Sequence, residues 1–210
     1  MINAVIKKEN PNRKWVVLGI IAAVIIGVGW FIMNQANKIP ALQEKVKAQW
    51  SQVLNNYQRR SDLIPNLVSV VKGYAAHEQS TFQAVVDARA KVGTMQLSPD
   101  ILANPETIRL FQENQQQLQG SLGRLIAITE NYPTLKADKN FLELQSQLEG
   151  TENRIAVARR DFILAVQEYN TFIQGIPGRW IANWLYPDAE PLQNFTVDPA
   201  IQNTPTVNFN

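Results

Sequence analysis

The longest regular pattern of apolar positions lies between residues 141 and 172. Apolar side chains recur there at alternating intervals of three and four residues, and only Thr151 among them is clearly polar. The positions are Phe141, Leu144, Leu148, Thr151, Ile155, Ala158, Phe162, Ala165, Tyr169 and Phe172. This spacing is typical of a helix that packs lengthwise against other helices. Such a helix does not stand alone in water, so the rest of the chain must supply its partners.

Two earlier stretches repeat this spacing and are separated by a proline. The first predicted helix begins at Ala41, just after Pro40, and ends near residue 60. Pro65 disfavours helical geometry in the residue before it and suits the first turn of a new helix. We therefore expect a turn at residues 62–64 and a second helix from Pro65 to about Gly93.

A third stretch begins at a cap residue followed by proline, a signature found at both residues 98–100 and residues 104–106. It ends at residues 131–133. The fourth helix carries the long pattern described first and ends at residues 175–177. Four long helices on short loops predict an all-α fold, an antiparallel up-and-down four-helix bundle over residues 40–177.

Residues 15–33 form an uncharged apolar run of 19 residues. As a helix the run reaches about 28 Å, close to the thickness of a hydrocarbon core. Trp15 and Trp30 lie near its ends, where indoles favour the membrane interface. A cleavable signal peptide and a buried core helix are the alternatives. A signal would need a shorter apolar run and a small-residue cleavage site, so the pattern favours a retained transmembrane helix.

Residues around this run bear on its orientation and on self-association. More positive side chains precede it than follow it, which favours a single-pass membrane protein with its N-terminus in the cytoplasm and the bundle outside. Gly19, Ala23 and Gly27 repeat at every fourth position, a spacing that permits close approach of two membrane helices. Glycine is also common in membrane helices for other reasons.

The charge of the chain is small and unevenly distributed. Twenty basic and 18 acidic residues give +2, and residues 1–14 form a basic flank of net charge +3. No large basic field remains for nucleic acid. The chain has no cysteine, which excludes disulfides and a cysteine nucleophile.

The chain after Pro177 changes character. Residues 178–186 contain three aromatic side chains, which predict either a helical turn that caps the bundle or an interfacial segment on the lipid surface. Residues 187–210 contain several prolines and few large apolar residues, which indicate an extended, mobile tail.

Catalytic motifs are absent from the sequence. His77 is the single histidine and lies in a predicted helix beside Glu78, without a nucleophile motif, so we interpret it as a solvent-facing residue. A di-iron site in a helical bundle needs two Glu-x-x-His pairs, and Tyr74 stands where the acid of such a pair would be. The sequence predicts no enzyme, no metal and no cofactor.

Charged and polar residues do occur close to the apolar stripes of the helices. They are Arg59, Arg60, Glu78, Glu152, Asn153 and Arg159. One interpretation is that they form interhelical ion pairs that fix helix register. The other is a polar groove that binds a partner peptide or a ligand.

Several segments between residues 40 and 186 resemble the LemA family of bacterial membrane proteins. The most specific are RRSDLIPNLV at residues 59–68 and TENRIAVARR at residues 151–160, with ENYPTLKA at residues 130–137 between them. The resemblance implies one N-terminal membrane helix, a long antiparallel helical bundle and no established enzymatic activity.

Together these observations predict a protein anchored in the lipid bilayer that acts by interaction or as a scaffold, with a protein partner or a second copy of itself. A sensor or ligand-binding module that uses the polar groove is the alternative.

Overall fold

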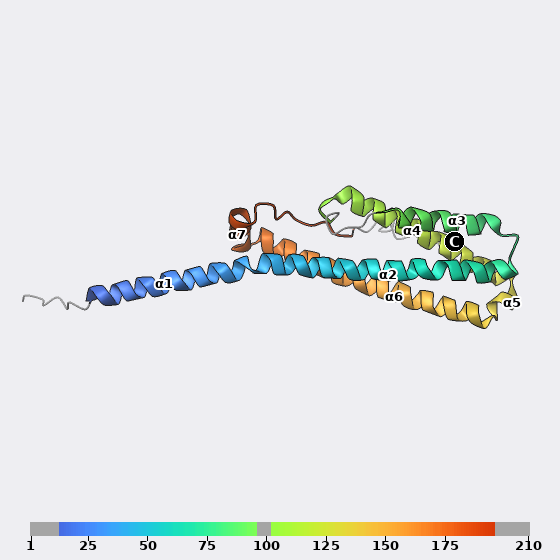
Figure 1. Cartoon of the computed structure of the whole chain (residues 1–210), viewed down its shortest axis with the longest axis horizontal. Helices are drawn as coiled ribbons and strands as arrows, with labels where there is room; N and C mark the ends of the chain where they lie inside the picture. The colour runs from blue at the N-terminus through green and yellow to red at the C-terminus, as the bar shows by residue number, and fades with distance from the viewer. Residues whose placement is uncertain (1–12, 96–101, 196–210) are drawn as a thin grey trace, which may run out of the picture.

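The computed structural model describes residues 13–95 and 102–195, and these residues form helices and connecting segments with no β-strand. The molecule is a long rod with one helix projecting from an end (Figure 1). The prediction of an all-α fold is confirmed. The basic flank at residues 1–14 and the alternative helix start at residues 98–100 lie almost entirely outside the described residues.

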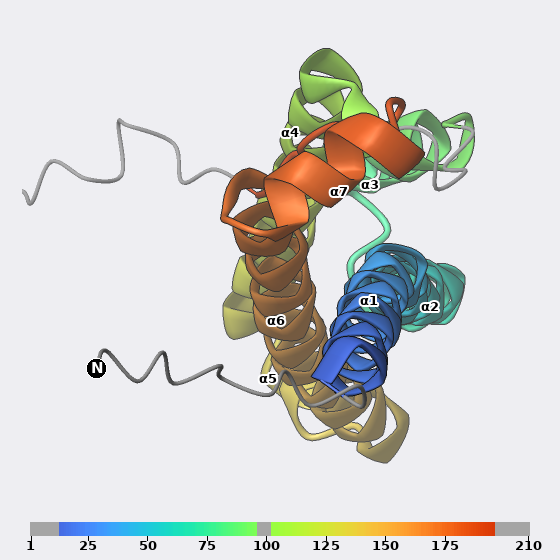
Figure 2. The same ribbon diagram turned by 90° about the vertical axis from the view of Figure 1, so that its left-hand side faces the viewer.

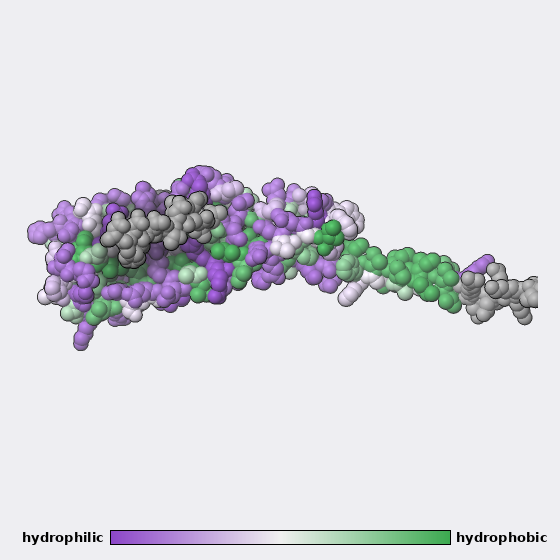
Figure 3. Space-filling model, turned by 180° about the vertical axis from the view of Figure 1, so that it is seen from behind, coloured by the Kyte–Doolittle hydropathy of each residue, from purple (hydrophilic) through white to green (hydrophobic). Residues whose placement is uncertain are grey.

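The projecting helix, α1 (Arg13–Ala36), contains the apolar run predicted from the sequence. Its side chains from Trp15 to Met33 are almost all exposed, and they form a continuous hydrophobic surface (Figure 3). In the described part of the chain, this is the one helix long and apolar enough to cross a membrane.

Helix α2 (Lys38–Tyr74) follows α1 after a single residue and is 37 residues long. It passes through Pro65 without interruption, so the turn predicted at residues 62–64 is wrong. A proline inside a helix leaves the carbonyl four residues earlier without its usual N–H donor. Here that carbonyl belongs to Ser61, and it accepts a hydrogen bond of 3.1 Å from Nε of Arg89 on another helix. This tertiary contact satisfies the group that Pro65 leaves free.

The chain turns instead at residues 75–78, where no turn was predicted. Ala75 ends α2 with a non-helical backbone and is itself buried. Glu78 then precedes α3 (Gln79–Gly93). The apolar spacing continues in phase across this short turn, which is why the sequence pattern does not reveal it.

The remaining long helices begin and end close to the predicted positions. Helix α4 (Pro105–Ile128) is capped at its N-terminus by Asn104, whose side chain accepts hydrogen bonds from the N–H groups of Glu106 and Thr107. A 3₁₀ turn, η2 (Thr129–Asn131), and the short α5 (Pro133–Lys136) connect it to α6 (Lys139–Gln174). A last helix, α7 (Gly178–Leu185), lies beside the end of α1.

The rod is built mainly from two pairs of helices, α2 with α6 and α3 with α4. Successive long helices run in alternating directions (Figures 1 and 2). Because α3 has 15 residues and α2 has 37, the four helices are far from equal in length. The predicted four-helix bundle is not confirmed in detail, because the bounds of its first two helices differ from those of α2 and α3.

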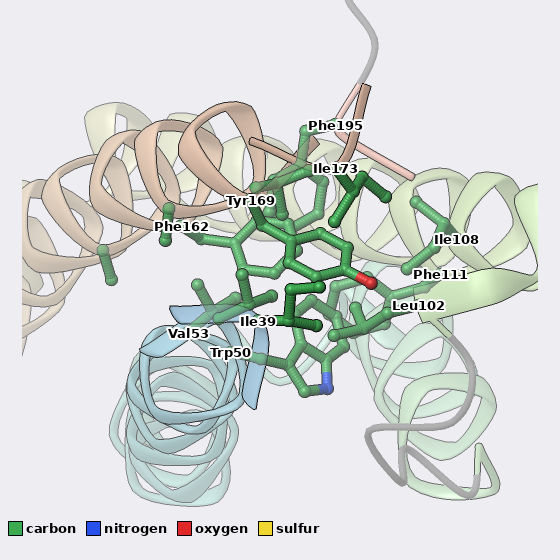
Figure 4. Close-up of a cluster of buried hydrophobic side chains, with 14 of the residues drawn as sticks. Ile39, Trp50, Val53, Leu102, Ile108, Phe111, Phe162, Tyr169, Ile173 and Phe195 are labelled. Carbon is green, nitrogen blue, oxygen red and sulfur yellow. The ribbon is translucent and has the colours of Figure 1, made fainter. Parts of the chain in front are cut away.

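Two hydrophobic clusters fill the interior. The cluster nearer α1 surrounds Trp50, which is fully buried against the rings of Phe111 and Phe162 (Figure 4). The far cluster includes Leu67, Val85 and Leu125, from three helices. All ten positions of the long apolar pattern on α6 are buried or half-buried, including Thr151. This confirms the pattern as the packing face of that helix.

Residues 187–195 have no regular secondary structure but pack on the helices. Asn170 holds this segment through two hydrogen bonds of 2.9 Å to the backbone of Leu192. Phe195 is 8% exposed and contacts the ring of Trp50. This part of the predicted mobile tail is thus packed against the rod, and the remainder lies outside the described residues.

Candidate functional site

A polar pocket of about 240 Å³ opens between α2, α4 and α6, near the middle of the rod. Its walls combine guanidinium, amide and carboxylate groups with a few apolar side chains. The lining residues are Tyr57, Arg60, Gln112, Gln115, Gln116, Gln119, Glu152, Asn153, Ile155, Ala156 and Arg159. Four of them belong to the six polar residues that the sequence singled out.

Arg60 lies on the buried face of α2. Along the uninterrupted helix, Tyr57, Arg60 and Ile64 follow one another at spacings of three and four, which places Arg60 on the packing face. Its side chain is only 2% exposed. A charge in such a position needs partners, since leaving it unpaired in a low-dielectric interior is costly.

The partners of Arg60 come from three helices. Its Nη1 lies 3.1 Å and 3.4 Å from the two carboxylate oxygens of Glu152 on α6. Its Nη2 donates to Oε1 of Gln115 on α4. The guanidinium also lies over the ring of Tyr57, with 5.0 Å between its central carbon and the ring centroid. Arg60 therefore ties α2, α4 and α6 together at one level.

Two buried donors in this cluster have no hydrogen-bond partner. They are Nε of Arg60 and the amide Nε2 of Gln115. Both residues line the pocket, and buried polar groups in folded proteins are normally hydrogen-bonded. The cluster thus contains two unsatisfied donors in residues of the pocket wall, and both donor atoms are themselves buried.

Arg159 forms the side of the pocket next to the tail segment. Its guanidinium lies 4.7 Å from the centroid of the Phe195 ring. Burial raises the pKa of the nearby Tyr57 phenol, and the positive charges of Arg159 and Arg60 partly oppose that shift. The Tyr57 phenol in the pocket wall therefore keeps its proton at neutral pH.

The polar groups of the pocket are suited to directed hydrogen bonds. Glu152 is the single carboxylate in the pocket lining, and it is engaged by Arg60. Among the described residues, no group of three or more His, Cys, Asp or Glu side chains could hold a metal ion. Guanidinium and amide groups recognise carboxylates and other acceptors through directed hydrogen bonds.

The structure brings together Arg60, Glu152, Asn153 and Arg159 and separates the other two predicted residues from them. Arg59 is exposed and does not line the pocket. Glu78, expected on the apolar stripe of a helix, instead precedes α3 at the far end of the rod. The turn at residues 75–78 takes Glu78 off the predicted apolar stripe, because α2 ends at Tyr74.

The sequence interpretation missed the glutamines and Tyr57. Gln115 occupies a packing position between Phe111 and Leu118, and a polar residue at such a position was the available signal. His77 lies in the turn at residues 75–78 and is exposed, whereas it was expected in a helix.

The small residues of the apolar run all lie on the exposed surface of α1. Gly19, Ala23 and Gly27 are exposed, and a Cβ atom added at Gly19 or Gly27 would meet no other atom within 4 Å. Within residues 13–95 and 102–195, no other segment lies against Gly19 or Gly27.

Comparisons with known proteins identify relatives of this chain. A family model described as the LemA family matches residues 49–209. Two magnetosome proteins of Paramagnetospirillum magneticum, MamQ 2 and MamQ 1, are each 28% identical to this chain over 196 aligned residues. MamQ of Magnetospirillum gryphiswaldense is 26% identical. Each alignment covers 83% of this chain and 72% of the relative.

Proposed function

Because this chain belongs to the LemA family, we propose that it is a non-catalytic scaffold of the bacterial cytoplasmic membrane. Helix α1 crosses the bilayer once, and the rod, an antiparallel up-and-down bundle of α2, α3, α4 and α6, makes the contacts. The relatives are named as magnetosome proteins, and their names state no enzymatic activity. The composition of the polar pocket supports the same reading, since it pairs its single carboxylate with an arginine.

The direct connection between the anchor and the rod carries this proposal. Asn37 alone separates α1 from α2, and its N–H donates to the carbonyl of Met33 at 3.0 Å, as in a continuing helix. Pro40 lies in the first turn of α2, where a proline is tolerated. With 37 residues at about 1.5 Å each, α2 extends about 55 Å from the anchor. A stiff connection of this kind holds contact surfaces at a defined height above the bilayer.

Positive charges on the two sides of α1 support an inside N-terminus. Lysine and arginine within the flanks favour the cytoplasmic side. Those before the helix or at its start are Lys7, Lys8, Arg13 and Lys14, and those after it are Lys38, Lys45 and Lys47. The excess on the N-terminal side supports a bundle outside the cytoplasm.

Self-association through α1 is part of this proposal. Gly19, Ala23 and Gly27 leave a smooth exposed strip that a second copy of α1 can approach closely. We expect Gly19→Ile and Gly27→Ile to weaken dimers measured by energy transfer between labelled copies in nanodiscs. Gly29→Ile is the matched control, because Gly29 lies on another face of the helix. Equal energy transfer in all three variants would contradict self-association along this strip.

Photo-crosslinking in intact cells tests the scaffold itself. A photoreactive residue at Val157, which is exposed on α6, is expected to crosslink to a specific protein or to a second copy. Insertion of four glycines after Asn37 should abolish that crosslink while membrane fractionation is unchanged, because the rod loses its fixed height. A chain that yields no protein crosslink at any exposed position of the rod would not be a scaffold.

A ligand-binding module is the second candidate, and the guanidinium and amide side chains that line the pocket favour it. A small dicarboxylate fits the donor groups and the volume of the pocket. Succinate is the probe, and an increase in unfolding temperature with concentration is the expected result. Arg159→Gln should remove that increase, whereas Arg160→Gln, an exposed neighbour paired with Asp161, should retain it. An equal response in both variants would exclude the pocket as the binding site.

A further inference from the structure

Helix α7 exposes two tryptophans on one side and buries apolar residues on the other. Trp180 and Trp184 are 65% and 72% exposed, and their spacing of four puts them on the same face. Ile181 and Ala182 are buried in the cluster around Trp50. Packing on the rod thus buries one face of α7, and the two indoles on the other face remain exposed.

The position of α7 along the molecule indicates what surrounds these indoles. Helix α7 packs against both α6 and α1. Ala36, at the end of α1, belongs to the same buried cluster as Ile181. Ala36 follows the last apolar residue of the exposed run, Met33, by only three positions. Helix α7 therefore lies at the level where the hydrophobic surface of α1 ends.

The direction of α7 is also informative. The view along α1 shows α7 lengthwise (Figure 2), whereas the side view shows it nearly end-on (Figure 1). Helix α7 thus runs crosswise to α1. When α1 crosses a bilayer, a helix in this orientation lies along the membrane surface, where indole rings are favoured because they are apolar and also carry an N–H donor.

A close approach between α6 and α7 maintains this placement. A Cβ atom at Gly178 would lie 2.0 Å from the carbonyl oxygen of Phe172, so only glycine fits at the start of α7. The N–H of Arg179 then donates to the carbonyl of Gly175 at 2.7 Å. Arg179 is exposed in the first turn of the same helix.

We propose that α7 is an interfacial foot that inserts Trp180 and Trp184 into the boundary between lipid headgroups and acyl chains. This inference rests on the membrane anchoring by α1 proposed above. The foot gives the rod a second attachment to the bilayer, close to the first, and so fixes its tilt and its rotation about α1. Arg179 contributes by its attraction to lipid phosphates.

Nitroxide labelling of the full chain tests the foot. The chain contains no cysteine, so Trp184→Cys provides a unique labelling site in nanodiscs of phosphatidylethanolamine and phosphatidylglycerol. Leu142→Cys is the matched control, an exposed apolar position at the far end of the rod. At residue 184 we expect the label to be more accessible to oxygen than to a water-soluble nickel complex, and at residue 142 the reverse. Trp180→Cys should repeat the result with Trp184 intact.

The possible outcomes separate the foot from the anchor. A label at Ile25→Cys, on the exposed surface of α1, reports the anchor alone. The foot would be overturned, and the anchor left intact, if the label at residue 25 is more accessible to oxygen while the label at residue 184 is more accessible to the nickel complex. Low accessibility to both reagents at residue 184 would mean contact with protein and would also overturn it. Nickel preference at residue 25 would overturn the anchor itself.

A second variant tests the role of Gly178. Gly178→Val should displace α7 from the end of α6, and the oxygen preference at residue 184 should fall while that at residue 25 is retained. An unchanged preference at residue 184 in this variant would show that the packing of α7 does not position the foot. Circular dichroism of the same samples verifies that the long helices remain folded.

Discussion

Arg60 on α2 and Glu152 on α6 form an ion pair with 3.1 Å between Nη1 and Oε1, although they are 92 positions apart in the chain. Arg60 is 2% exposed and Glu152 is 33% exposed. The pair therefore joins a buried guanidinium group to a partly exposed carboxylate. It stands at the centre of the polar pocket and of the contact between the two longest helices.

Removal of Glu152 should be more costly than removal of an exposed acid. Glu152→Ala leaves Arg60 buried with fewer partners, so we expect a loss between the ~1 kcal/mol of an exposed pair and the ~3–5 kcal/mol of a buried one. Glu168→Ala, which breaks the exposed pair with Lys45, is the control and should cost less than about 1 kcal/mol. Urea unfolding in detergent micelles measures both. Equal losses would mean that burial of Arg60 has no energetic consequence.

Pro65 and Arg89 should be energetically coupled. Arg89 donates to the Ser61 carbonyl that Pro65 leaves without a partner, so Arg89→Ala should cost about 1 kcal/mol in the wild-type chain. In the Pro65→Ala background, the new N–H of residue 65 can bond the same carbonyl, and the cost should fall towards zero. A double-mutant cycle by urea unfolding gives the coupling. Additive losses would show that Arg89 does not compensate for the proline.

Phe195 should contribute to stability although it lies beyond the last helix. Its ring contacts Trp50, Phe111 and Phe162, so Phe195→Ala should cost about 3 kcal/mol. The exposed Leu142 provides the control, because Leu142→Ala should change stability by less than about 0.5 kcal/mol. Thermal unfolding followed by circular dichroism measures both variants. A neutral Phe195→Ala would mean that residues 187–195 are not packed in solution.

Stability should fall at alkaline pH partly because of Tyr57. Burial raises the pKa of its phenol above the ordinary value of 10.0, so the unfolded chain loses this proton at lower pH than the folded chain. The stabilisation is complete below pH 10.0 and is lost as the pH rises through the pKa of the folded state. Tyr57→Phe should reduce the decline in unfolding free energy above pH 10.0. An identical decline in both proteins would mean that other groups cause the loss of stability. Tyr169 is one such group, because burial also raises the pKa of its phenol.

The helix ends show how far local chemistry reaches. The side chains of Asn104 and Asp138 cap α4 and α6 by accepting hydrogen bonds from backbone N–H groups two or three residues later. Interactions over so short a range can be predicted from the sequence. Pro65 predicted a helix end by the same reasoning and was misleading. Its effect depends on Arg89, which lies 24 positions further along the chain and reaches Ser61 only in the folded protein.

By itself, the sequence determined the helical class, the apolar run of α1, the packing face of α6 and the family, because each depends on neighbouring residues or on a repeat along one helix. Only the tertiary structure decided that α2 is continuous, that Arg60 is buried with Gln115 and Glu152, and that α7 lies crosswise beside the end of α1. Those features depend on which distant side chains meet to satisfy a carbonyl, a buried charge or an apolar face. Periodicity along one helix specifies which side is buried but carries no information about the residue that will face it.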